Sequence, residues 1–235
     1  MKFRHLLFDL DNTLYPASSA MDTGITQRML ECVASFFNCS LEQAKIIRKE
    51  RITNFSTTLE WLRSEGLKDT DGFLNYVHPE SEKYEVPLQP ALREFLLSIP
   101  LPKSILTNSN HVHAERVLKT LGVFDLFETI TDITDANFKG KPYPSAYKAA
   151  VEKINQKAEK PLRIEEILFF DDMQKYTDGW NVLGGTSVLI GNKNGCPIHE
   201  NSPIRKIQKD CSAGIQPGKT IKLNDIYELT KKDIL

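Results

Sequence analysis

The first hydrophobic segment of the chain runs from Phe3 to Leu10 and is interrupted by Arg4 and His5. It ends abruptly in the polar sequence Asp-Leu-Asp-Asn-Thr of residues 9–13. A short apolar run followed by acidic residues is typical of a buried strand that carries polar side chains at its carboxyl end. We therefore expect a strand over residues 3–10.

The following segment, residues 20–76, has the periodicity of helices rather than strands. Its hydrophobic residues recur every three or four positions, as in Ile25, Met29, Leu30, Val33, Phe36 and Phe37. Ser40, followed by Leu-Glu-Gln, resembles the N-cap of a helix, and residues 57–64 and 71–77 are shorter helical candidates. The sequence thus predicts an all-helical insertion, which closes near the prolines at 79 and 87.

After the insertion, hydrophobic runs alternate with amphipathic segments. The predicted strands are residues 103–107, 129–133, 167–170 and 186–190, and the predicted helices are residues 90–98, 112–121, 145–157 and 173–183. Residues 191–218 are rich in Gly, Asn, Pro and Lys and are predicted as a long loop, followed by a strand and a helix over 221–235. This alternation indicates the α/β class, with a doubly wound parallel sheet covered on both faces.

The composition narrows the possible functions. The 235 residues suffice for one large domain or for a core with a small second domain. Thirty basic and 31 acidic residues give a net charge of −1, so we expect neither a nucleic-acid polymer nor a membrane as partner. The first eight residues are too short a hydrophobic run for a signal peptide. Four cysteines without a CxxC pair favour a cytoplasmic location, and no pattern indicates an oligomeric state.

Polar side chains suited to chemistry lie at the ends of predicted strands or before a predicted helix. They are Asp9, Asp11, Thr107, Asn108, Lys141, Asp171 and Asp172. Ligands of open parallel sheets bind beyond the carboxyl ends of the strands. We therefore expect these side chains to face one crevice, although they come from distant parts of the chain.

The residue types in this set fit phosphoryl transfer to water. Clustered Asp oxygens are suitable ligands for Mg²⁺. A carboxylate such as Asp9 can attack phosphorus once the phosphoryl charge is neutralised, which the metal, Lys141 and the Thr107 hydroxyl would share. A second carboxyl, Asp11, can protonate the leaving alkoxide and then activate water. The expected partner is a small phosphorylated metabolite.

Four segments, in this order, resemble the motifs of the haloacid dehalogenase superfamily. They are Asp9-Leu10-Asp11-Asn12-Thr13, Ile105-Leu106-Thr107-Asn108-Ser109, Gly140-Lys141-Pro142-Tyr143-Pro144 and Phe169-Phe170-Asp171-Asp172. They span most of the chain, and the helical insertion lies where this family places its cap. The resemblance implies a catalytic core over residues 1–15 and 86–235 and a helical cap over residues 16–85.

The resemblance also implies a role for each motif residue. Asp9 would be the nucleophile and a metal ligand, Asp11 the acid/base with its backbone carbonyl on the metal, Thr107 and Asn108 the phosphoryl-binding residues, Lys141 the cation between nucleophile and phosphate, Asp172 the main fourth-motif metal ligand, and Asp171 a ligand or its support. Related sequences continue the fourth motif with Ser and, three residues later, Asp or Asn. This chain has Met173 and Tyr176 instead, and Asp178 is a candidate substitute.

The string Asp-Leu-Asp-Asn-Thr-Leu-Tyr-Pro of residues 9–16 resembles the pyrimidine 5′-nucleotidase branch, which implies a nucleoside 5′-monophosphate as substrate. Tyr15 is expected to face the site. Cap aromatics able to stack on a base are Phe37, Phe55, Trp61 and Tyr84, although packing is the favoured interpretation for most of them. The alternatives are a sugar phosphomutase, a phosphoglycolate-type phosphatase, and a catalytically weak binding or scaffold protein. Asp11 disfavours dehalogenation, because dehalogenating members lack the second aspartate.

Two histidines, His111 and His113, follow the second motif. Residues two apart at the start of a helix do not share a face, which argues against a joint metal site. A surface or cap-contacting role is predicted for both.

Overall fold

The computed structural model describes residues 3–191 and 218–229. Its centre is a parallel sheet with the strand order β3-β2-β1-β4-β5-β6. The strands are β1 (His5–Phe8), β2 (Lys103–Leu106), β3 (Thr129–Thr131), β4 (Ile167–Asp171), β5 (Thr186–Ile190) and β6 (Thr220–Leu223). The predicted doubly wound α/β fold is confirmed. Most of the predicted 191–218 loop and the end of the predicted C-terminal helix lie outside the described residues.

Strand β1 lies in the middle of the sheet, between β2 and β4. Leu7 is opposite Ser104 of β2 on one side and Phe169 of β4 on the other, and both pairings are parallel. The chain adds β2 and β3 on one side of β1 and then crosses over to add β4, β5 and β6 on the other. The strand order therefore reverses between β1 and β4, which is where sheets of this kind bind ligands.

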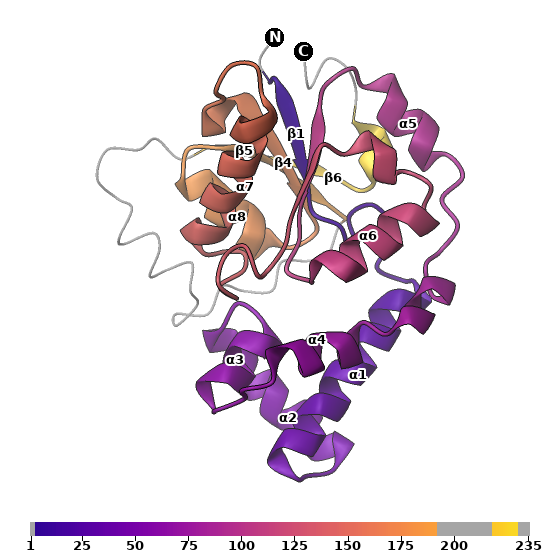
Figure 1. Cartoon of the computed structure of the whole chain (residues 1–235), viewed down its shortest axis with the longest axis vertical. Helices are drawn as coiled ribbons and strands as arrows, with labels where there is room; N and C mark the ends of the chain where they lie inside the picture. Colours follow the sequence, from indigo (N-terminus) through magenta and orange to yellow (C-terminus); the bar gives the residue numbers. More distant parts are fainter. Residues whose placement is uncertain (1–2, 192–217, 230–235) are drawn as a thin grey trace.

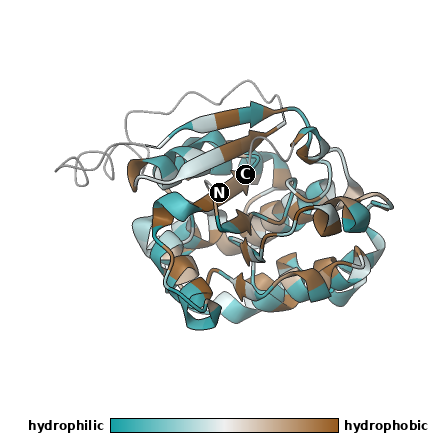
Figure 2. Cartoon of the chain, turned by 90° about the horizontal axis from the view of Figure 1, so that it is seen from above, coloured by the Kyte–Doolittle hydropathy of each residue, from teal (hydrophilic) through white to brown (hydrophobic). Residues whose placement is uncertain are grey.

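Side chains that alternate along the buried strands place helices on both faces of the sheet. Leu6 and Phe8 pack with α5 (Leu92–Ser98) and α6 (His111–Thr120), while Leu7 packs with α7 (Pro144–Lys157) and α8 (Gln174–Val182). Figure 2 shows hydrophobic and hydrophilic residues on the same helical ribbons, as expected of helices with one face toward a core.

Four helices form a group of their own at the lower end of Figure 1. They are α1 (Ala20–Phe37), α2 (Leu41–Arg51), α3 (Thr58–Ser64) and α4 (Thr70–Val77). The predicted N-cap of α2 is confirmed, because Ser40 Oγ accepts from the backbone N–H of Gln43 and the Gln43 side chain accepts from that of Ser40. The group has a hydrophobic cluster around Trp61, Leu62 and Val77 that is distinct from the two clusters on the sheet.

Short 3₁₀ helices connect these elements. They are η1 (Ile52–Asn54), η2 (Glu80–Tyr84), η3 (Phe124–Leu126), η4 (Ile164–Glu166) and η5 (Ile226–Glu228). Segment η2 leads from the four-helix group back to the sheet domain. On the opposite side the two groups also touch, because the Ser56 carbonyl accepts from Lys175 Nζ at 3.2 Å and from Tyr176 Oη at 3.3 Å.

Candidate active site

The residue that follows β1 is held firmly at the carboxyl edge of the sheet. The Asp9 backbone N–H donates to the Phe170 carbonyl at 2.8 Å and so continues the β1–β4 ladder. The chain then turns at Asn12, whose φ of 66° lies in the left-handed region that Asn tolerates. This turn brings the Thr13 hydroxyl back to Asp9, where it donates to Oδ2 at 3.0 Å. One carboxylate oxygen of Asp9 is thereby fixed from its own loop.

Lys141 holds the other Asp9 oxygen. Its Nζ lies 2.5 Å from Asp9 Oδ1 and 2.6 Å from Asp171 Oδ2, and all three side chains are buried. Burial by itself would lower the pKa of Lys141, but the two carboxylates outweigh it and raise that pKa. Burial also raises the pKa of Asp9 and of Asp171, and the Lys141 charge opposes it in both. One buried cation therefore serves two acids that come from different strands.

Asn108 positions this lysine. Its Oδ1 accepts from the Lys141 backbone N–H at 2.7 Å, and its Nδ2 donates to the Lys141 carbonyl at 3.0 Å. The Asn108 side chain was expected to hold a phosphoryl group, but both of its polar atoms are engaged with the backbone of Lys141. Thr107 is buried on the same edge, where its Oγ1 accepts from the Ser109 N–H at 3.0 Å, and its own hydroxyl proton remains available for a ligand.

Three acids at this edge could share one metal ion. Asp9, Asp171 and Asp172 each offer a carboxylate oxygen, and these atoms all lie within 4.8 Å of one another. An all-oxygen, carboxylate-rich set is the donor chemistry that Mg²⁺ prefers, so the residues fit the predicted metal. Asp171 is fixed further by the Met173 backbone N–H, which donates to its Oδ1 at 2.8 Å.

The carboxylate of Asp11, the expected acid/base, contacts three side chains. Tyr15 Oη donates to Asp11 Oδ1 at 2.5 Å, His113 Nε2 lies 2.8 Å from the same oxygen, and Ser109 Oγ donates to Oδ2 at 3.1 Å. Burial would raise the pKa of Asp11, but His113 and Tyr15 hold that pKa below its usual range. Tyr15 therefore faces the site as predicted, and its contact is with Asp11.

The prediction of a surface or cap-contacting role is correct for both histidines, because His111 lies on the surface and His113 contacts Glu82, which belongs to residues 16–85. His111 is exposed, whereas His113 is fully buried between Asp11 and Glu82. Burial would lower the pKa of His113, yet the two carboxylates outweigh it and raise the pKa to about 9. The only sequence signal for the burial of His113 was its spacing relative to Ala114 and Val117, which places it with them on the inner face of α6.

The two departures from the family motif have structural partners. Met173 contributes its backbone N–H to Asp171, as described above. The Tyr176 ring lies 5.1 Å from Lys141 Nζ, and the Tyr176 hydroxyl reaches the Ser56 carbonyl of the helical group. Asp178 accepts from Gln174 at 2.6 Å instead of supporting the acids.

A cavity of about 650 Å³ opens above these groups, between the sheet edge and the helical group. Asp9, Lys141 and Asp172 lie on its sheet side. Phe55 and Arg48 are on its helical side, where Arg48 Nε donates to Thr58 Oγ1 at 3.0 Å. The other aromatic candidates do not line it: Phe37 and Trp61 stack with ring centroids 5.4 Å apart, and Tyr84 is exposed.

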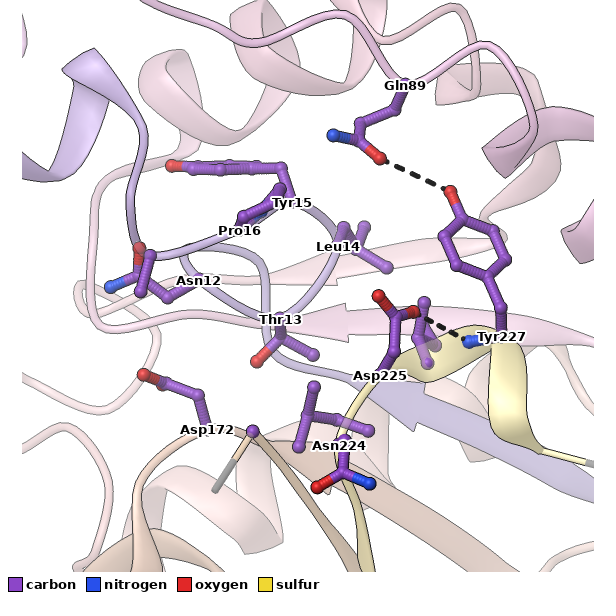
Figure 3. Close-up of a pocket in the computed structure, with 14 residues that line it drawn as sticks. Asn12, Thr13, Leu14, Tyr15, Pro16, Gln89, Asp172, Asn224, Asp225 and Tyr227 are labelled. Carbon is purple, nitrogen blue, oxygen red and sulfur yellow. Dashed lines mark hydrogen bonds between the residues drawn. The ribbon is translucent and has the colours of Figure 1, made fainter. Parts of the chain in front are cut away.

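A smaller cavity of about 180 Å³ adjoins the first. It lies between the loop that contains Thr13 and the segment from Asn224 to Tyr227 (Figure 3). Tyr227 closes one side of it, with its hydroxyl 3.3 Å from Gln89 Oε1 and its backbone N–H 2.9 Å from Asp225 Oδ1. Asn12, Tyr15 and Asp172 line both cavities, so the two cavities share part of their walls.

Among the residues that the structure describes, none of the helices has the length and hydrophobicity that crossing a membrane requires.

Solved structures with the same architecture come from several organisms. YfnB from Bacillus subtilis, a HAD-hydrolase bound to magnesium, is 15% identical with a TM-score of 0.58, and the match covers 97% of each chain. A HAD phosphatase from Thermococcus onnurineus is 18% identical with a TM-score of 0.56, covering 92% of this chain and 100% of that one. β-Phosphoglucomutase from Clostridium difficile is 17% identical with a TM-score of 0.59, covering 99% and 95%. At these identities the comparison shows the fold alone.

The family follows from the sequence itself. The sequence profile of the haloacid dehalogenase-like hydrolases matches residues 3–174, which contain all four motifs and the acids and lysine described above. The protein therefore belongs to the haloacid dehalogenase-like hydrolases.

Proposed function

We propose that the protein is a Mg²⁺-dependent phosphohydrolase that releases phosphate from a small phosphomonoester through an aspartyl-phosphate on Asp9. The observation that carries the proposal is the pairing of Asp9 with Lys141 at 2.5 Å, on the floor of a cavity that also contains the second acid, Asp11. A carboxylate nucleophile next to a buried cation suits attack on a phosphoryl group, because the cation reduces the repulsion between two anions.

In the proposed reaction, an Asp9 oxygen forms a bond to phosphorus as the bond from phosphorus to the leaving oxygen breaks. The leaving oxygen takes the electron pair of that bond and a proton from Asp11. Water then attacks phosphorus and gives a proton to Asp11, and the Asp9–phosphorus bond breaks with its electron pair returning to the Asp9 carboxylate. Lys141 and the Thr107 hydroxyl would stabilise the charge on the phosphoryl oxygens throughout.

The metal would be held by Asp9 and Asp172, with Asp171 as a further ligand or as support, and by the Asp11 backbone carbonyl. When bound, Mg²⁺ supplies positive charge to the phosphoryl oxygens and orients them for in-line attack. The cluster of three buried carboxylates supports this assignment.

We further propose a pyrimidine nucleoside 5′-monophosphate as the substrate and residues 16–85 as the cap that selects it. The cavity exceeds the size needed for inorganic phosphate alone, which supports a sizeable leaving group. Phe55 offers an aromatic ring on the cap side, and Arg48 offers a guanidinium for carbonyl oxygens of a base. A cytoplasmic location remains a prediction from the cysteine pattern.

Phosphate release tests the proposal. The purified protein would be incubated with Mg²⁺ and a panel of nucleoside monophosphates, sugar phosphates and phosphoglycolate. We expect release that is fastest with UMP or CMP, stops in EDTA, and disappears in Asp9→Asn. Asp125→Asn is the matched control, because Asp125 is exposed and paired with Arg93 far from the site. Release from another substrate would refute the nucleotidase assignment alone, and release that persists in Asp9→Asn would refute the mechanism.

A further inference from the structure

Asp11 is held by three donors, and one of them lies outside all four motifs. Tyr15 and Ser109 belong to the first and second motif segments or lie beside them, whereas His113 comes from the first turn of α6. His113 Nε2 lies 2.8 Å from Asp11 Oδ1, the same oxygen that accepts from Tyr15. Two donors on one oxygen and one on the other leave the Asp11 carboxylate little freedom to rotate.

The far side of the His113 ring is held just as closely. Its Nδ1 lies 2.8 Å from Glu82 Oε1, and both side chains have no solvent exposure. Because a carboxylate accepts at each ring nitrogen, both nitrogens must act as donors, and the ring plane is fixed between Asp11 and Glu82. Arg116 Nη1 donates to the same Glu82 oxygen, and His78 Nδ1 lies 3.1 Å from the other.

These hydrogen bonds connect the segment η2 to the proposed acid/base, Asp11. Glu82 belongs to η2, the segment that leads from the four-helix group back to the sheet domain. His113 belongs to α6, on the sheet, and Asp11 to the loop after β1. A change in the position of η2 would therefore be transmitted through two hydrogen bonds to the carboxylate of Asp11.

A metal site made of His78, Glu82 and His113 is the competing interpretation, since their ligand atoms lie within 4.8 Å of one another. The guanidinium of Arg116 is bonded to Glu82, the one anionic ligand of that set, and would repel a divalent cation there. His113 would also have to give up its contact with one of the two carboxylates. The contacts therefore favour a hydrogen-bonded positioning network.

We propose that His113 is a positioning residue that orients Asp11 for proton transfer, and that Glu82 holds His113 in place for this task. The inference rests on the proposed phosphohydrolase function, in which Asp11 gives a proton to the leaving oxygen and later takes one from water. Proton transfer requires the carboxyl oxygen to lie within hydrogen-bond reach of its partner, so a carboxylate free to rotate is a poorer acid and base.

Substrates with different leaving groups test this role. An alkoxide such as that of UMP needs a proton as it leaves, whereas p-nitrophenolate leaves without one. In His113→Leu we expect kcat/KM for UMP to fall ~100-fold and kcat/KM for p-nitrophenyl phosphate to fall less than ~3-fold. A burst of p-nitrophenolate should also appear, because hydrolysis of the aspartyl-phosphate still needs a well-placed base.

Further variants separate positioning from folding. His113→Gln keeps an amide N–H that can reach Asp11, and we expect it to recover most of the UMP activity. Glu82→Gln weakens the support of His113 without touching Asp11, and we expect a smaller loss with the same dependence on leaving group. His111→Ala is the matched control, because His111 is exposed on the same helix, and its activity should equal that of the wild type.

Equal losses of kcat/KM on both substrates in His113→Leu, His113→Gln and Glu82→Gln would assign His113 a merely structural role and overturn the inference. His113→Gln and Glu82→Gln carry the test if His113→Leu does not fold. If the wild type released phosphate from no substrate, the proposed function would fail instead. Nitrogen-15 NMR of the histidines would then decide the network by itself: two protected ring N–H signals from His113 support it, and the absence of either overturns it.

Discussion

Replacing Lys141 by Met would remove the cation between Asp9 and Asp171 and keep most of the side-chain volume. Lys141 Nζ lies 2.5 and 2.6 Å from the two acids, and all three side chains are buried. In Lys141→Met, two buried carboxylates would be left without their shared cation. The fold must then either keep two unpaired charges or bind protons from solution.

The structure sets the size of the effect. Breaking a buried ion pair by removing one partner costs about 3–5 kcal/mol of stability. Because one cation here serves two acids, we expect the free energy of unfolding to fall by about 5 kcal/mol at pH 8. Burial raises the pKa of Asp9 and Asp171 in the fold, and removing Lys141 raises both further. The folded variant then binds more protons than the unfolded chain, so its stability rises as the pH falls. We expect the deficit relative to the wild type to be clearly smaller at pH 5.5.

Urea unfolding in EDTA, at both pH values, measures this deficit. Lys153→Met is the matched control, because Lys153 Nζ lies 2.5 Å from Asp135 in a pair that is partly exposed to solvent. Its loss should stay below ~1 kcal/mol at both pH values. Adding Asp9→Asn and Asp171→Asn to Lys141→Met should restore much of the stability, because no unpaired charge remains. A Lys141→Met deficit as small as that of Lys153→Met, or one that is independent of pH, would refute the electrostatic argument.

Three further predictions concern other residues. Burial, aided by Lys103, lowers the pKa of His5 to about 4. Because the unfolded chain binds this proton from about pH 6.5 downward, the free energy of unfolding should fall by up to ~1.4 kcal/mol per pH unit between pH 6 and 4.5. Urea unfolding should show a gentler fall in His5→Gln. An equal slope in both proteins would contradict it. Gly122 ends α6 with a φ of 70° and open space around its Cβ position, so Gly122→Ala should cost about 1 kcal/mol in thermal unfolding, and no change would contradict the strain argument. A Cβ on Gly140 would lie 2.2 Å from Asn108 Oδ1, so Gly140→Ala should displace Asn108 from Lys141. We expect kcat for phosphate release to fall ~10-fold or more. An unchanged kcat would show that Asn108 does not position the lysine.

Local patterns predicted the elements well, since each depends on neighbouring residues. The N-cap at Ser40 and the helices of residues 20–77 follow from spacing and capping chemistry alone. Element ends were less accurate: β1 covers His5–Phe8 rather than residues 3–10, and α5 begins at Leu92 rather than at residue 90. The order of the strands depends on contacts between distant residues, which no local pattern contains.

The candidate site also contains residues that the sequence predicted and residues that it did not. Asp9, Lys141 and Asp171 lie in ordered motifs, and the structure brings them together as expected. Glu82 and His113 belong to no such motif. Each is polar and each is fully buried, because its charge is compensated by the other, 31 positions away in the chain. A hydropathy pattern predicts that such residues are solvent-exposed, because it contains no information on the distant residue that compensates their charge.

The central place of β1 in the sheet has a consequence for how the chain folds during synthesis. β1 is synthesised long before one of its two neighbours, β4, which begins at Ile167. The helices of residues 20–77 make mostly local contacts and can form early, whereas β1 keeps an unpaired edge until β4 has been made. Pairing between such distant segments is slow. The order of synthesis thus leaves one edge of the hydrophobic strand β1 open to incorrect pairing until β4 is available.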